Sequence, residues 1–183
     1  EAACRNMIGG GARNLIEQAF AVIGERADEA QIDDLFERFL DLYRDEPAIR
    51  SKPFPGVIDA LEALQGRGHA LGICTNKPQD LSELVLDGLD MGRFFGDAVI
   101  GGDALAIRKP DGGHLLEVIQ RLGHPPADSV MVGDSATDVG AARNAGVPVI
   151  AVDFGYTDRP AAELGADALI SHFDGLLDAM TRF

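Results

Sequence analysis

Apolar residues recur at helical spacing through the first fifty residues. One amphipathic run covers residues 15–23, and a second, after Gly24, covers residues 32–43. Proline disfavours the helical conformation in the residue before it, so Glu46-Pro47 ends the second run. We therefore expect two helices packed as a hairpin. Their apolar positions are Leu15, Ile16, Ala19, Phe20 and Ile23, then Ile32, Leu35, Phe36, Phe39, Leu40 and Tyr43.

From residue 57 the pattern changes to helices that alternate with short apolar runs. This alternation is typical of an α/β domain with a parallel sheet, whose strands are buried on both faces. Pro53-Phe54-Pro55-Gly56 is a rigid connection, so we place a small helical unit at 1–50 and an α/β domain at 51–183. The expected strands are 70–75, 98–100, 130–132, 148–152 and 168–170, and the expected helices are 57–66, 78–88, 114–122, 136–146 and 173–180.

Composition narrows the classes of function. Of the 183 residues, 46% are hydrophobic, so a proper core is expected. The 30 acidic and 16 basic residues give a net charge of −14, which opposes nonspecific binding to nucleic acid or anionic membranes. An anionic substrate would need a local positive site. Cys4 and Cys74 lack metal-ligand spacing, and no long apolar segment or signal pattern is visible, so we expect a cytoplasmic protein.

Two carboxylates follow the apolar run at 130–132. Gly133 is expected to let the chain turn, which puts Asp134 and Asp138 at the carboxyl end of a strand and in the first turn of a helix. In open α/β sheets, ligands bind at that edge. A capping box formed by Ser135 and Asp138 is the alternative interpretation. It does not explain Asp134, for which we favour cation binding.

Polar residues also occupy two earlier loops. Thr75 and Asn76 end a predicted strand and precede a helix, where a hydroxyl, an amide and a helix N-terminus form a plausible anion site. Helix capping by these residues is an equally good interpretation. Lys109 precedes Pro110, so it is held extended at a loop edge. Taken alone, Lys109 would be an ordinary solvated lysine.

Together the three loops resemble the haloacid dehalogenase superfamily of phosphohydrolases. Thr75-Asn76-Lys77-Pro78, Lys109-Pro110-Asp111, Val132-Gly133-Asp134-Ser135 and the helical residues 1–50 are similar to its phosphoglycolate phosphatase branch. The resemblance covers essentially the whole chain. It implies a Rossmann-like parallel sheet with a small helical cap.

The resemblance also implies roles for individual residues. Thr75 and Asn76 would bind the transferring phosphoryl group, Lys109 would neutralise it, and Asp138 would be a supporting carboxylate. Asp134 would bind Mg²⁺, a cation that prefers hard oxygen ligands. The expected substrate is a small phosphomonoester, 2-phosphoglycolate, and the expected protein is a monomer or homodimer.

One motif of the family is missing. Its Asp-x-Asp, which supplies the nucleophile at the end of the first strand, occurs nowhere in this sequence. In the family that strand lies between those expected to end at Thr75 and Val132. We therefore expect further sequence upstream of residue 1. A truncated, noncatalytic module that keeps a phosphate or metal site is the alternative.

Arg13 is the candidate for substrate selection. It follows Gly9-Gly10-Gly11 in the first turn of a helix, where free N–H groups and a guanidinium together would bind a carboxylate. A glycine-rich link with a solvated arginine is the alternative.

Overall fold

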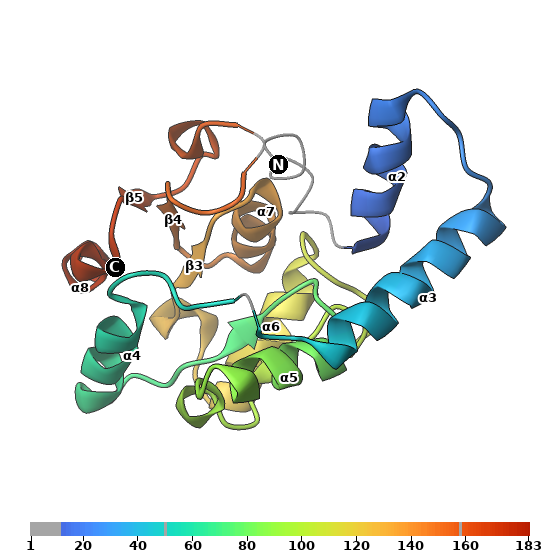
Figure 1. Cartoon of the computed structure of the whole chain (residues 1–183). Helices are drawn as coiled ribbons and strands as arrows, with labels where there is room; N and C mark the ends of the chain where they lie inside the picture. Colours follow the sequence, from blue (N-terminus) through green and yellow to red (C-terminus); the bar gives the residue numbers. More distant parts are fainter. Residues whose placement is uncertain (1–11, 50, 158) are drawn as a thin grey trace.

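The computed structural model describes residues 12–49, 51–157 and 159–183. Its first two helices, α2 (Ala12–Ile23) and α3 (Glu29–Asp45), pack against each other and stand beside the rest of the molecule (Figure 1). Helix α3 begins with a capping box, in which the Asp28 side chain accepts the Gln31 N–H and the Gln31 side chain accepts the Asp28 N–H. The helix ends just before Glu46-Pro47, as the sequence predicts.

The remaining residues alternate helices and strands in the predicted order. Helix ends agree closely with the sequence pattern. Strands β1, β2 and β4 are shorter than the predicted runs, whereas β3 and β5 have the predicted length. The helices are α4 (Val57–Gly66), α5 (Gln79–Gly88), α6 (Gly112–Leu122), α7 (Ala136–Ala145) and α8 (Leu176–Met180), with 3₁₀ turns at Gly92–Phe94, Pro126–Asp128, Ala161–Glu163 and Phe173–Gly175. The strands are β1 (Ile73–Cys74), β2 (Val99–Ile100), β3 (Met131–Gly133), β4 (Val149–Val152) and β5 (Ala168–Ile170).

All pairings between these strands are parallel, which confirms the predicted α/β class. Strand β1 pairs with β2, and β3, β4 and β5 form a second sheet in that order. The sequence predicts one sheet, whereas the described strands form two, because no backbone hydrogen bond joins β1 to β3. This interruption falls where the family resemblance implies a further strand.

Helices cover both faces of the β3-β4-β5 sheet. On β4, the side chain of Ile150 packs in a buried cluster with Leu64 of α4 and Leu176 of α8. Its neighbour Val149 packs in another cluster with Leu115 of α6 and Val139 of α7. Since successive strand residues face opposite sides, β4 anchors both halves of the core.

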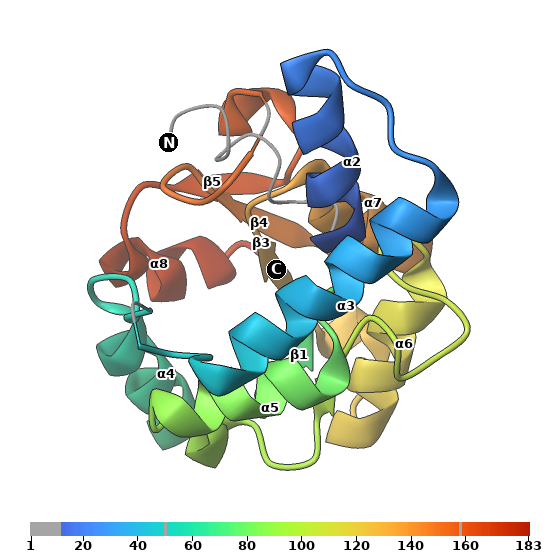
Figure 2. The same cartoon turned by 45° about the vertical axis from the view of Figure 1, so that its right-hand side comes forward.

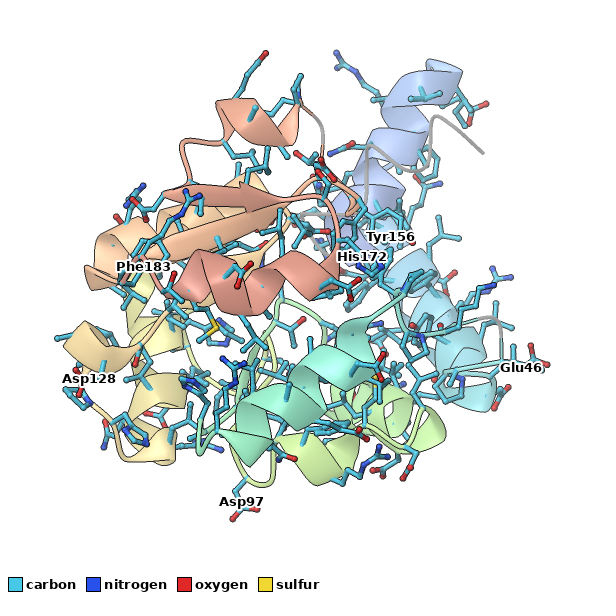
Figure 3. All side chains as sticks on the ribbon, turned by 90° about the vertical axis from the view of Figure 1, so that its left-hand side faces the viewer. Glu46, Asp97, Asp128, Tyr156, His172 and Phe183 are labelled. Atoms are coloured by element: carbon cyan, nitrogen blue, oxygen red, sulfur yellow. The ribbon has the colours of Figure 1, made fainter. Side chains whose placement is uncertain are left out.

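Helix α3 contacts the α/β part through α5, beside which it lies in Figure 2. Arg44 of α3 donates to Asp80 of α5 at 2.9 Å. The helical hairpin therefore rests on the α/β part with its inner side facing the ends of β1 and β3. The acidic side chains of Glu46, Asp97 and Asp128 are exposed at the periphery (Figure 3). None of the helices described is both long enough and apolar enough to span a bilayer.

Candidate active site

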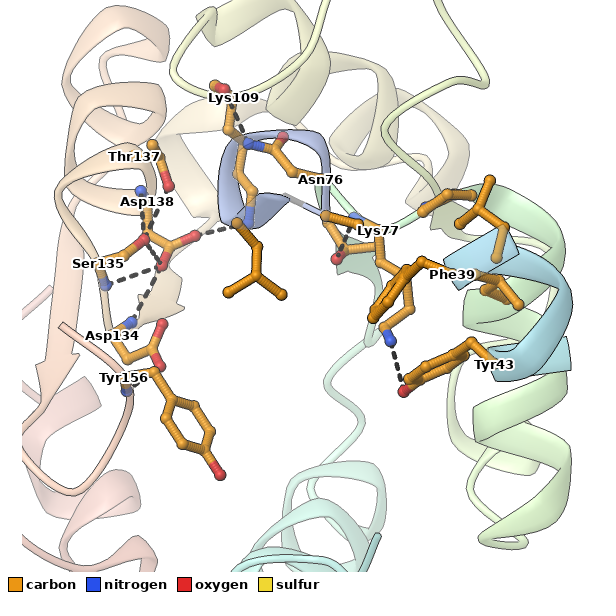
Figure 4. Close-up of a pocket in the computed structure, with 16 residues that line it drawn as sticks. Phe39, Tyr43, Asn76, Lys77, Lys109, Asp134, Ser135, Thr137, Asp138 and Tyr156 are labelled. Carbon is orange, nitrogen blue, oxygen red and sulfur yellow. Dashed lines mark hydrogen bonds and ion pairs between the residues drawn. The ribbon is translucent and has the colours of Figure 1, made fainter. Parts of the chain in front are cut away.

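A pocket of about 490 Å³ lies between the helical hairpin and the carboxyl ends of β1 and β3 (Figure 4). Its volume is typical of a small-molecule site. The structure brings together all of the predicted site residues except Arg13. The polar residues that line the pocket are Tyr43, Thr75, Asn76, Lys77, Lys109, Asp134, Ser135, Thr137, Asp138 and Tyr156.

Asp138 caps the N-terminus of α7 and also forms an ion pair with Lys109. Its Oδ2 accepts the N–H groups of Asp134 (3.1 Å) and Ser135 (3.0 Å), and Ser135 Oγ accepts the Asp138 N–H (3.4 Å). The capping box is thus confirmed. Oδ1 of Asp138 accepts a hydrogen bond from Lys109 Nζ at 2.6 Å. Lys109 is only 10% exposed, so the solvated alternative is wrong for it.

The pKa values of the two pocket carboxylates are shifted in opposite directions. Burial alone would raise the pKa of Asp138, but the charge and hydrogen bond of Lys109, aided by Ser135, lower it below its usual range. Lys109 forms its ion pair with Asp138 rather than with Asp134. Burial, reinforced by the charge of Asp138, therefore outweighs the charge of Lys109 and raises the pKa of Asp134. A carboxylate held in this way gains from binding a cation.

Gly133 leaves space for a neighbouring side chain and does not form a turn. It lies within β3, and its φ angle is not among the positive ones. A Cβ at Gly133 would lie 2.3 Å from Cβ of Asp138. The predicted role of Gly133 is therefore wrong: glycine is needed because the Asp138 side chain folds back over the strand.

The loop after β4 packs against Asp134 and donates a hydrogen bond to it. The Tyr156 N–H donates to its Oδ2 at 2.7 Å, and a Cβ at Gly155 would lie 2.2 Å from Cβ of Asp134. The Tyr156 ring lines the pocket beside Asp134 (Figure 4). Sequence reasoning missed Tyr156, since a loop tyrosine more than twenty residues away carries no local signal.

Thr75 and Asn76 do not cap α5. Its N-cap residue is Pro78, and the N–H of Gln79 donates to Asp103 Oδ1 at 2.7 Å. The capping alternative is therefore wrong, and Asp103 occupies the helix N-terminus expected to help bind an anion. Thr75 Oγ1 instead accepts the Lys77 N–H at 3.1 Å.

Asn76 ties two of the loops together. Its Nδ2 donates to the backbone carbonyl of Lys109 at 3.0 Å. Its Oδ1 is buried and has no hydrogen-bond partner within the described part of the chain. One hydrogen remains on Nδ2 after this bond.

Arg13 does not line the pocket. It pairs with Asp33 and, at 3.5 Å, with Glu17, so its guanidinium ties α2 to α3. The pairing with Asp33 raises the pKa of Arg13. Gly9-Gly10-Gly11, the other part of that predicted anion site, lies outside the described residues.

Lys77 is a second pocket cation, which sequence reasoning overlooked. Its Nζ donates to Tyr43 Oη at 2.7 Å and lies 4.1 Å from the centroid of the Tyr43 ring. Figure 4 shows Lys77 and Tyr43 across the open pocket from Asp134. Because this contact joins the β1 loop to α3, only the assembled fold reveals it.

Comparison with known proteins identifies the family. The sequence model of the haloacid dehalogenase-like hydrolases matches residues 2–146. The chain belongs to this family. A phosphoglycolate phosphatase from Agrobacterium fabrum is 45% identical over 175 residues, covering 96% of this chain and 75% of that protein. One from Caulobacter vibrioides is 44% identical over 169 residues, covering 92% and 71%.

Solved structures of haloacid dehalogenase-like proteins share the fold. A crystal structure described as a predicted phosphoglycolate phosphatase from Haemophilus somnus aligns with a TM-score of 0.86 and 26% identity, covering 97% of this chain and 80% of that one. With the family match, these relatives place the chain among the phosphoric monoester hydrolases and favour the enzyme over a noncatalytic module.

The carboxylates described at this haloacid dehalogenase-like site fit Mg²⁺. No group of three His, Cys, Asp or Glu side chains converges within the described ranges. Mg²⁺ usually keeps several waters and takes one or two carboxylates, so a single oxygen ligand suits it. Asp134 offers that ligand, because Asp138 is already bound to Lys109.

Proposed function

We propose that the complete protein is a Mg²⁺-dependent phosphatase that hydrolyses 2-phosphoglycolate. An aspartate in a segment upstream of residue 1 would attack phosphorus and form an aspartyl-phosphate as glycolate leaves, and water would then release phosphate. The observation that supports this proposal is the convergence of Thr75, Lys109 and Asp134 from three loops in one pocket. The domain roles follow: residues 1–50 form the cap, and residues 51–183 form the core.

The phosphoryl group would lie between the β1 loop and Lys109. Because Thr75 Oγ1 already accepts the Lys77 N–H, the hydroxyl keeps its own proton to donate. Asn76 adds its second amide hydrogen, and Lys109 adds charge-assisted hydrogen bonds. These groups position and neutralise a transferring phosphoryl group, which is most of what such a reaction requires of a protein.

The charge of the pocket explains the need for a metal. Among the described residues that line it, Lys77 and Lys109 balance Asp134 and Asp138. A phosphoryl dianion therefore meets no net positive charge from these side chains, in a protein whose total charge is −14. When bound at Asp134, Mg²⁺ would supply that charge.

Lys77, rather than Arg13, would recognise the substrate carboxylate. It lies across the pocket from Asp134, and its partner Tyr43 is a hydroxyl rather than a carboxylate. An ammonium has three donors, so Lys77 has capacity for a carboxylate while it stays in contact with Tyr43. Among the described residues that line the pocket, Lys77 is the cation that remains for the carboxylate once Lys109 binds the phosphoryl group.

The test of the metal site compares Asp134→Asn with Asp128→Asn in the complete protein. Asp128 is exposed, so its variant controls for loss of one carboxylate. We expect Asp134→Asn to lower turnover by about 100-fold or more and to raise the Mg²⁺ concentration for half-maximal rate. Turnover that resists chelation of Mg²⁺ and survives Asp134→Asn would contradict the assignment.

The test of substrate choice compares Lys77→Met with Lys52→Met, which replaces an exposed lysine. Lys77→Met should lower kcat/KM for phosphoglycolate by about 1.5–3 kcal/mol, the range for hydrogen bonds to charged groups. It should change kcat/KM for p-nitrophenyl phosphate little, because that substrate has no carboxylate. Equal losses on both substrates would remove Lys77 as the selector.

A further inference from the structure

His114 is buried next to the candidate active site but does not line it. The side chain is completely buried, in the first turn of α6. Its Nδ1 lies 3.5 Å from Sγ of Cys74, at the end of β1, and its Nε2 lies 3.0 Å from the carbonyl oxygen of Gly101, just after β2. One ring therefore connects the carboxyl ends of two paired strands.

The chemistry of these partners determines where the protons lie. A carbonyl oxygen only accepts, so Nε2 of His114 must carry a hydrogen. Burial lowers the pKa of His114, which keeps the ring neutral and leaves Nδ1 as an acceptor. Burial also raises the pKa of Cys74 to about 11, so its thiol keeps the proton that it donates to Nδ1. We call this arrangement of Cys74, His114 and Gly101 the His114 bridge.

At its Gly101 end, the bridge contacts the loop that begins with Thr75 and Asn76, the loop proposed to bind the phosphoryl group. The N–H of Gly102 donates to Lys77 O at 2.8 Å, and a Cβ at Gly102 would lie 2.4 Å from Asn76 O. A Cβ at Gly101 would lie 2.4 Å from the Gln79 backbone nitrogen. The turn and the loop thus touch through their backbones, and a shift of Gly101 must move the loop.

At its Cys74 end, the bridge is connected to the same loop through strand β1. Cys74 immediately precedes Thr75, whose N–H donates to Ile100 O at 3.1 Å. Rotation of Cys74 would therefore turn the Thr75 hydroxyl relative to Lys109. Such placement matters, because small misplacements of catalytic groups cost large factors in rate.

We propose that His114 is a positioning residue whose bonds to Cys74 and Gly101 hold the Thr75-Asn76 loop in the geometry that binds a phosphoryl group. This inference rests on the proposed phosphatase function for its kinetic consequence. The tautomer of His114 and the hydrogen bonds of the His114 bridge can be tested without measuring turnover.

The first experiment reads the tautomer of His114 in the complete protein by ¹⁵N nuclear magnetic resonance of the imidazole. We expect protonated Nε2 and unprotonated Nδ1. His114→Leu should also speed hydrogen exchange at the Thr75 and Gly102 amides relative to His124→Leu, a control at an exposed histidine. Protonated Nδ1, or unchanged exchange, would overturn the proposal whether or not the protein is a phosphatase.

The second experiment measures kinetics and phosphate binding. His114→Leu should lower kcat for p-nitrophenyl phosphate, and the affinity for inorganic phosphate measured by calorimetry, by about tenfold or more. His114→Gln, which keeps an N–H for Gly101 O, should recover most of both. If His114→Leu does not fold, the comparison of Cys74→Ala with Cys74→Ser, which keeps a donor, replaces it. Full activity and phosphate affinity in a folded His114→Leu, or in Cys74→Ala, would overturn the proposal.

Discussion

The ammonium group of Lys109 lies 2.6 Å from Oδ1 of Asp138, and the two side chains are 10% and 6% exposed. Among the described residues, no other ion pair is as deeply buried. The pair joins the loop before α6 to the first turn of α7, and so connects the Lys109 loop to the loop that carries Asp134.

Replacing one member of this pair should destabilise the complete protein strongly. Lys109→Met leaves Asp138 buried without its cation, which costs about 3–5 kcal/mol in comparable pairs. Urea unfolding measures the change. Arg121→Ala, which breaks the exposed pair with Glu117, should cost less than about 1 kcal/mol. Adding Asp138→Asn to Lys109→Met should recover part of the loss, and strictly additive costs would contradict a direct interaction.

Gly133→Ala should damage both stability and activity. The new methyl group would lie 2.3 Å from Cβ of Asp138, so α7 or β3 must shift, at a cost of about 1–3 kcal/mol. Gly66→Ala is the matched control, because its Cβ meets nothing within 4 Å at the end of α4. That change should be neutral or stabilise by up to about 1 kcal/mol. Similar unfolding free energies for the two variants would show that Asp138 does not need the space.

His114 should make stability depend on pH. Burial lowers its folded pKa below the ordinary value of 6.5, so the unfolded chain binds the proton first. The free energy of unfolding should therefore fall as pH drops below about 6.5 towards the folded pKa, by at most about 1.4 kcal/mol per pH unit. His114→Gln removes this contribution, with His69→Gln as control. Parallel pH profiles for the parent and His114→Gln would contradict a buried neutral histidine.

The thiol of Cys74 should react slowly in the folded protein. With a pKa of about 11, raised by burial, its thiolate is scarce near neutral pH. Modification by an aromatic disulfide reagent, in a Cys4→Ser background, should run at least about 100-fold slower than for a small thiol. Unfolding in urea should restore the ordinary rate. A fast reaction in the folded state would mean that Cys74 is accessible and does not donate to His114.

Apolar periodicity alone predicted the order and type of the elements. Helices α2 to α7 lie close to where the period of apolar residues puts them, and the strands coincide with short apolar runs. The Ser135–Asp138 capping box was also predictable, because its members are three residues apart and cap geometry is local. Parallel topology then placed Thr75, Lys109 and Asp134 at one edge.

Only the tertiary structure decided which side chains bind each other there. Lys109 pairs with Asp138 across 29 residues, Lys77 contacts Tyr43 across 34, and Arg13 turns to Asp33 across 20. No periodic pattern encodes such contacts, since they depend on how helices and loops approach once the core has packed. For the same reason the sequence marked Gly133 as a turn, although the carboxylate that needs its space arrives from the following helix.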